Sequence, residues 1–206
     1  MLRLPPKDEV FAAFEVANNK IENMLHAPNG NLLGKGEDEI IALYLDDFFV
    51  SLFEINNHRY YKIQKARILD FFQENNNVYI QMGESYLAFE NKLYYPCLCS
   101  LMTFVEKLLA DSKNPQSTNY KRLLQEKLCA LDKICSNDND TVILKSSLTG
   151  FLEFLSKSSN FAEDEPSSIN RHWLLHGRVN RKIEKIDCLK LFAVIDSIIE
   201  VNEKLR

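Results

Sequence analysis

The residue types best suited to chemistry lie in one stretch near the C-terminus, where residues 169–178 read INRHWLLHGR. This stretch holds two of the four histidines, the only tryptophan and two arginines. Between residues 171 and 190 there are two acidic residues and six basic ones: Arg171, Arg178, Arg181, Lys182, Lys185 and Lys190. That segment carries +4 in a chain of net charge −4, so the remainder carries −8. A local positive patch in an acidic protein predicts an anionic ligand, above all a phosphate, although a solvated basic face or an ion-paired helix end fits the same charges.

The spacing within this stretch resembles the signature of HEPN-domain proteins, in which a histidine follows an arginine after four to six intervening residues. Arg171 and His176 have this spacing, and the residue after the arginine, commonly polar in that family, is His172. The apolar helix expected from residue 186 onward also resembles the end of the HEPN helical bundle. The resemblance implies a metal-independent endoribonuclease, often a toxin or a defence effector, that dimerises so that both Arg/His sets face one shared cleft.

The resemblance also assigns roles to residues. Arg171 would clamp the phosphate and His176 would act as acid or base, with Asn170 and His172 as supporting groups. Further basic residues would contact RNA phosphates: Arg178, Arg181 and Lys182. Histidine suits proton transfer because its ordinary pKa lies near neutrality, and arginine keeps its charge and presents a fork of donors. Attack by the 2′-OH on the phosphate would give 2′,3′-cyclic phosphate and 5′-OH ends, with no metal or cofactor.

Helix geometry limits how the motif residues can meet. Residues five apart on an ideal helix are about 140° apart, so Arg171 and His176 do not share a face. Their convergence would need the long arginine side chain, a helix end or a second protomer. His172 and His176 do share a face, as the two histidines of HExxH do, and a metal site there would take a third ligand such as Asp187 or Glu163. A purely structural role for both histidines, hydrogen-bonded at a helix end, is the remaining alternative.

The expected partners are RNA and a second copy of the chain, and no membrane. Many HEPN toxins silenced by a partner nucleotidyltransferase carry a tyrosine two residues past the histidine, where this chain has Arg178. That form of control is therefore not expected, while an antitoxin or another regulatory partner stays open. A competing hypothesis is a catalytically inactive helical module that binds a nucleotide or a protein partner. The complete pair of Arg171 and His176 favours the enzyme.

Composition supports a folded protein of ordinary type. The 206 residues are 46% apolar and 26% charged, which excludes a disordered chain and a disulfide scaffold. No apolar run reaches the length of about 18 residues that a membrane-spanning helix needs. The N-terminal MLRLPPKDEV has no apolar core, so we expect no signal peptide and a cytoplasmic location. The five cysteines, an odd number in apolar surroundings, are expected to be buried free thiols.

Apolar periodicity predicts an all-α fold, a helical bundle of about seven to eight helices with a HEPN-like C-terminal part. The expected helices cover residues 8–25, 37–56, 59–80, 84–110, 120–135, 141–155, 169–176 and 186–205. Residues 78–82 could also be extended, and Pro96 is expected to break or kink its helix. The polar loop at 111–118 suggests an N-terminal region, 1–110, of unknown role and a HEPN-like bundle, 111–206, although the two can form one continuous domain.

Several single positions carry smaller predictions. Ser167 or Ser168 suits the N-cap of the motif helix, and Gly177 suits its C′ position. Asp46 and Asp47 interrupt an apolar helix, and an ion pair with an arginine would account for one of them. An aromatic stripe is expected in the core or at a dimer interface, with base stacking as the alternative: Tyr86, Phe89, Tyr94 and Tyr95.

Overall fold

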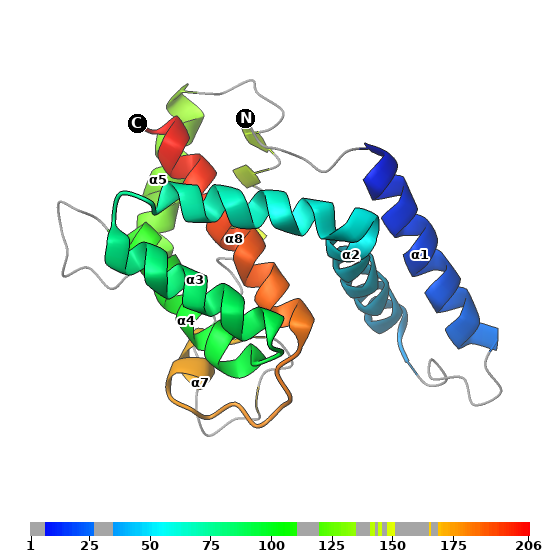
Figure 1. The fold of residues 1–206 in the computed structure, drawn as a ribbon. Helices are drawn as coiled ribbons and strands as arrows, with labels where there is room; N and C mark the ends of the chain where they lie inside the picture. The colour runs from blue at the N-terminus through cyan, green and yellow to red at the C-terminus, as the bar shows by residue number, and fades with distance from the viewer. Residues whose placement is uncertain are drawn as a thin grey trace. The chain divides into compact units, whose positions relative to one another are not determined.

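Every regular element that the computed structural model describes is an α-helix, which confirms the predicted all-α class (Figure 1). The structure describes residues 7–26, 35–110, 120–134, 141–142, 144–145, 148–150, 165 and 169–206. Within these ranges the helices are α1 (Lys7–His26), α2 (Glu37–Phe71), α3 (Asn76–Glu90), α4 (Tyr94–Leu109), α5 (Tyr120–Ile134), α7 (Arg171–Leu175) and α8 (Lys185–Lys204). None of these helices is long and apolar enough to cross a membrane.

Contacts divide the chain into two compact units, with residues 3–66 in one and residues 67–206 in the other. The break falls inside α2, whereas α4 and α5, which flank residues 111–118, belong to the same unit and contact each other. The division at residue 110 remains a prediction from composition.

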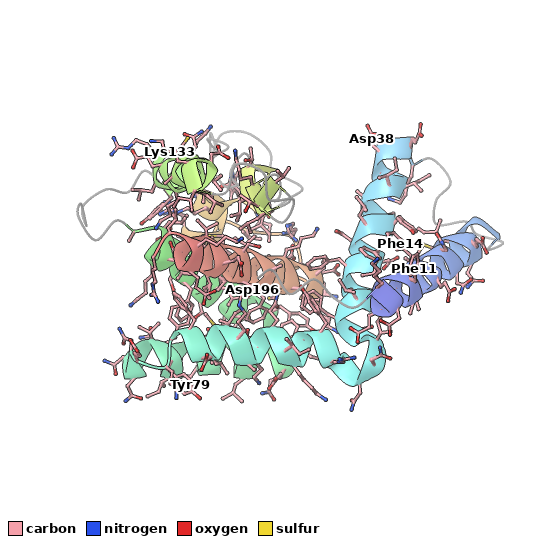
Figure 2. The ribbon with its side chains drawn as sticks, turned by 90° about the horizontal axis from the view of Figure 1, so that it is seen from above. Phe11, Phe14, Asp38, Tyr79, Lys133 and Asp196 are labelled. Atoms are coloured by element: carbon pink, nitrogen blue, oxygen red, sulfur yellow. The ribbon has the colours of Figure 1, made fainter. Side chains whose placement is uncertain are left out.

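The first unit is built from α1 and the first part of α2. Phe14 of α1 stacks on Phe48 of α2 with ring centroids 4.2 Å apart (Figure 2). Asp47 forms an ion pair with Lys20, so an ion pair does account for this carboxylate, although its partner is a lysine and not an arginine. A second ion pair joins Arg59 of α2 to the buried Glu9 of α1 at 3.4 Å. Aromatic stacking and these cross-helix ion pairs thus fix how the two helices face each other.

A backbone break lies within α2. Asn56, Asn57 and His58 have φ angles of 49°, 56° and 59°. This left-handed region is costly for most side chains, and asparagine tolerates it best after glycine. The predicted separation of two helices here is confirmed, although the non-helical backbone already begins at Ile55, one residue before the predicted end at residue 56.

The core of the second unit forms where α4 packs on α8 and α3, with α5 against both α4 and α8 (Figure 1). Tyr86 of α3 stacks on Phe192 of α8, with centroids 4.4 Å apart and planes within 5°. Phe89 meets the same ring edge-on. Tyr86 and Phe89 are therefore core residues, as predicted, whereas Tyr95 is 42% exposed.

Two helix boundaries differ from the sequence expectation. The predicted helix 59–80 ends at Phe71, and Asn75 then caps α3, its side chain accepting a hydrogen bond from the backbone N–H of Val78 at 3.4 Å. Residues 78–82 are consequently helical. The break predicted at Pro96 lies before it, where Lys92 adopts a φ of 62°, and Pro96 sits in the first turn of α4. Proline is tolerated there because first-turn N–H groups have no partner in the helix.

The cysteine prediction is only partly correct. Cys97 and Cys188 are fully buried free thiols, but Cys129 is exposed on α5. A hydrogen bond with Cys97, then burial, raise the pKa of Cys188 above its ordinary value. Such a thiol is inert at physiological pH. Cys135 lies outside the described residues.

Arg67 ties the end of α2 to α8. Its guanidinium bonds to Asp196 at 2.9 Å and to Glu203 at 3.0 Å, and it also pairs with Glu200, whose side chain is 1% exposed. Asp196 is labelled on α8 in Figure 2. Burial lowers the pKa of Arg67, but the three carboxylates raise it more, so the net shift is upward. The arginine therefore compensates the charge of a buried carboxylate.

We expect Arg67→Ala to lower the free energy of unfolding by about 3 kcal/mol, because it leaves Glu200 buried without its cation. Arg122→Ala is the matched control, since Arg122 pairs with Glu126 on the surface of α5, where both side chains are 58% exposed. That control should cost less than about 1 kcal/mol. Urea unfolding followed by circular dichroism measures both changes, and equal losses would contradict the structural role of Arg67.

Candidate functional site

The motif residues are carried by α7, a helix of five residues that contacts α4. Asn170 is its N-cap. Its buried side chain accepts hydrogen bonds from the backbone N–H groups of His172 at 2.9 Å and Trp173 at 3.3 Å. Asn170 thus takes the capping position predicted for Ser167 or Ser168, and that prediction is wrong. The capping role explains why an asparagine precedes the arginine, whatever else this side chain does.

The C-terminal end of α7 is closed by a Schellman motif. Gly177, with φ of 64°, donates its N–H to the carbonyl of Leu174, and the N–H of Arg178 reaches the carbonyl of Trp173 at 2.9 Å. The left-handed C′ position favours glycine because it has no Cβ. The prediction for Gly177 is therefore confirmed, and His176 lies at the C-cap.

Arg171 is held by two residues from other helices. Its Nε donates to the carboxylate of Glu106 near the end of α4, and its guanidinium lies 5.0 Å from the centre of the Tyr120 ring at the start of α5. The Tyr120 hydroxyl donates to the same carboxylate at 3.4 Å. Burial, then the charge of Glu106, raise the pKa of Tyr120, which therefore stays a neutral donor. Arg171 is therefore held in place, and paired with a carboxylate, before any ligand binds.

His172 and His176 have different surroundings from Arg171. Both residues are exposed, and their rings are parallel within 5° with centroids 6.3 Å apart. Between them, Trp173 and Leu174 point inward and are buried. The structure therefore brings the two histidines together on the surface, as their spacing predicts, and anchors the turn that carries them in the core.

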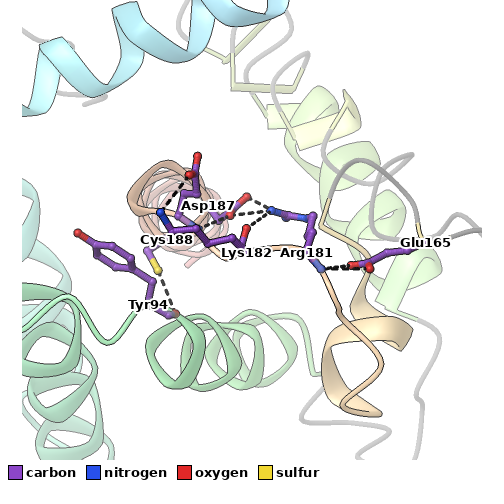
Figure 3. A network of polar contacts seen from close by, with 7 residues as sticks. Tyr94, Glu165, Arg181, Lys182, Asp187 and Cys188 are labelled. Carbon is purple, nitrogen blue, oxygen red and sulfur yellow. Dashed lines mark hydrogen bonds and ion pairs between the residues drawn. The ribbon is translucent and has the colours of Figure 1, made fainter.

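Two further basic residues of the patch, Arg181 and Lys182, also lie near acidic ones (Figure 3). The guanidinium of Arg181 makes two hydrogen bonds of 3.0 Å to Asp187, and its backbone N–H donates to Glu165. Asp187 additionally accepts from the N–H of Glu184 at 2.9 Å, which caps the start of α8. Lys182 is 85% exposed and lies 3.7 Å from Glu184. Arg181 is thus a structural link between the turn after α7 and α8, while Lys182 remains at the surface.

Two residues of this site escaped the sequence analysis. Glu106 and Tyr120 stand 65 and 51 positions before Arg171, on helices whose sequences show only a core pattern. A single acidic residue in the last turn of an apolar helix is ordinary. Only the packing of α4 and α5 beside α7 brings these side chains to the motif.

A shallow depression beside α7 is lined by side chains of α4, α7 and the turn after it, among them Leu98, Trp173 and Arg181. It leaves no interior space for a water-sized molecule. In the same described ranges, no group of three or more His, Cys, Asp and Glu side chains could hold a metal ion. Asp187, weighed as a third metal ligand, is bound to Arg181, and Glu163 lies outside the described residues.

Comparison with known proteins adds no assignment. No protein family model matches the sequence, and neither the curated proteins nor the solved structures that were searched contain a match.

We expect Asn170→Ala to reduce the free energy of unfolding by about 1 kcal/mol, because two N–H groups of α7 lose their acceptor. Asn170→Asp keeps an acceptor at the N-cap and should retain most of that stability. Asn77→Ala, at an exposed position of α3, controls for the loss of an amide side chain and should change stability by less than about 0.5 kcal/mol. Chemical denaturation measures all three, and an Asn170→Ala variant as stable as the wild type would show that the cap is dispensable.

Proposed function

We propose that this protein is an endoribonuclease of HEPN type that cleaves RNA without a metal, with Arg171 and His176 as its catalytic pair. The observation that carries the proposal is the arrangement of α7. A short helix, capped at both ends, presents His176 to solvent and carries Arg171, five residues earlier, in a position fixed by its ion pair with Glu106. A proton-transfer group on an open surface and a pre-oriented cation are the two requirements for attack by a 2′-OH on a phosphodiester.

In this mechanism each motif residue has a defined task. His176 accepts the proton of the attacking 2′-OH or gives one to the leaving 5′-oxygen. Arg171 stabilises the charge that develops on the phosphorane oxygens. Its Nε is bonded to Glu106, but a guanidinium carries five N–H donors, so a phosphate can bind at the Nη groups while the ion pair persists. The shallow depression beside α7 suits a polymer that lies along a surface better than a small molecule that needs a cavity.

The exposed cations near α7 would bind the flanking phosphates. Lys182 and Arg178 are both exposed and follow the motif directly. Arg181 is committed to Asp187, so its contribution to RNA binding would be smaller than the sequence suggested. The same proposal includes two partners, a second copy of the chain and an antitoxin or another regulatory protein. It also includes a role as a toxin or defence effector.

The competing proposal is a helical module that binds a nucleotide or a protein partner without catalysis. One observation favours it. Arg171 and Arg181, two of the cations assigned to phosphate, each form an ion pair with a carboxylate of the same chain. An arginine bound in this way can serve the fold alone, and ligand binding would then rely on the exposed residues.

The first test is cleavage of total and transfer RNA in EDTA. We expect the wild type to give products with 2′,3′-cyclic phosphate and 5′-OH ends, and Arg171→Ala and His176→Ala each to be slower by about a hundredfold or more. Lys62→Ala, an exposed residue of the other unit, is a control for lost positive charge and should cleave normally. Cleavage that survives both motif substitutions would reject the assigned site. A folded dimer with no cleavage would favour the binding module.

A second test uses the ion pair of Arg171. Replacing Glu106 by Gln removes the competing carboxylate, so a labelled single-stranded RNA should bind about tenfold more tightly at low salt. Glu126→Gln makes the same charge change on the exposed surface of α5 and should shift affinity much less. Fluorescence anisotropy at two salt concentrations measures both, and the gain should shrink as salt rises. Equal effects of the two substitutions would mean that Arg171 does not contact the RNA.

A further inference from the structure

His172 and His176 form a pair whose geometry the proposed reaction does not require. Proton transfer needs one imidazole, yet α7 presents two that are parallel within 5°, exposed and separated by one helical turn. Imidazoles at positions i and i+4 on one face of a helix are close enough for one nitrogen of each to bind the same ion.

The backbone beneath this pair is fixed from both ends. Asn170 caps the first turn, the Schellman motif at Gly177 sets the backbone of His176, and the side chains of Trp173 and Leu174 are buried. A chelate gains affinity when its ligands are held close together before the ion arrives. The two histidines are held in that way.

We propose that His172 and His176 bind a borderline divalent cation, with Zn²⁺ as the reference, as a two-nitrogen chelate completed by water. Zn–N bonds of about 2.05 Å at a tetrahedral angle place two imidazole centroids about 5 Å apart. The observed centroids are 6.3 Å apart, so binding requires a closure of roughly 1 Å, which side-chain rotation of exposed rings supplies.

Two of the arginines near the pair are offset by carboxylates, whereas the exposed Arg178 disfavours an added cation. The charge of Arg171 is offset by its ion pair with Glu106, and Arg181, further along the turn, is offset by Asp187. No third protein ligand joins the two histidines among the described residues. The site is therefore open, exchanges its ion readily and prefers cations that accept nitrogen ligands over Mg²⁺ or Ca²⁺, which bind oxygen.

A bound ion would also control the proposed reaction. This consequence rests on the proposed function, whereas the proposed metal site is independent of that function. An imidazole nitrogen that ligates Zn²⁺ cannot accept or deliver a proton. Occupation of the pair would thus remove His176 from catalysis and place a positive ion beside Arg171. The protein would then be a ribonuclease that needs no metal and is inhibited by Zn²⁺.

Isothermal titration calorimetry of the full chain with ZnCl₂ tests the site directly. We expect the wild type to bind Zn²⁺, and His172→Ala and His176→Ala each to bind it at least about tenfold more weakly, because the chelate becomes a single ligand. Cys129→Ser and His58→Gln control for an exposed thiol and for a histidine elsewhere, and both should bind as the wild type does. MgCl₂ should give no binding.

Three results would overturn the assignment: no Zn²⁺ binding by the wild type, an affinity equal to that of the wild type in either α7 variant, or loss of binding in Cys129→Ser. Circular dichroism of each variant establishes that it is folded. The consequence for catalysis is read from RNA cleavage by the wild type with ZnCl₂ against cleavage in EDTA. A wild type that cleaves no RNA but still binds Zn²⁺ through α7 would reject the proposed function and support the metal site. A wild type that cleaves RNA but does not bind Zn²⁺ would support the proposed function and reject the metal site.

Discussion

The packing of α4 against α8 is the interaction on which the described part of the C-terminal unit depends. Residues from both helices, among them Leu98, Leu101 and Phe192, are fully buried, and α3 and α5 contact one or both of them. The motif helix has five residues, too few to be stable alone, so its position depends on this pair of helices. α4 supplies Glu106 to Arg171, and the start of α8 supplies Asp187 to Arg181.

The second main feature of this unit is the pairing of its arginines with carboxylates. The sequence places +4 within residues 171–190, yet two of its arginines are paired with carboxylates, one of them from a distant helix. Partly buried guanidinium groups require such partners, because an unpaired charge loses its hydration without compensation. The positive field that an anionic ligand meets is therefore smaller than the local count of charges, and the exposed residues contribute most of it.

The two motif residues occupy contrasting environments. Arg171 is clamped between a carboxylate and an aromatic ring, whereas His176 lies at an exposed helix end beside a parallel imidazole. This contrast fits a division of labour in which the cation is rigid and the proton carrier is accessible. It also fits a structural arginine beside a surface histidine pair. The catalytic and the structural interpretations share the same local fold, so a measurement of reactivity at the site distinguishes them.

Local sequence was enough to predict the all-α class, the αL glycine at Gly177 and the histidine pair, because each depends on backbone preference or on spacing within one turn. It misplaced the boundaries between α2, α3 and α4. It misplaced the N-cap of α7, since Asn170, Ser167 and Ser168 are all good caps and helix length decides between them. Local sequence did not predict the side chains that pair with Arg171, Arg181 and Asp47. Glu106 and Tyr120 reach the motif only because α4 and α5 pack beside α7, and no pattern within either helix records that neighbour. Tertiary structure alone decided which charges compensate which, because an ion pair depends on the distance between atoms and not on their separation along the chain.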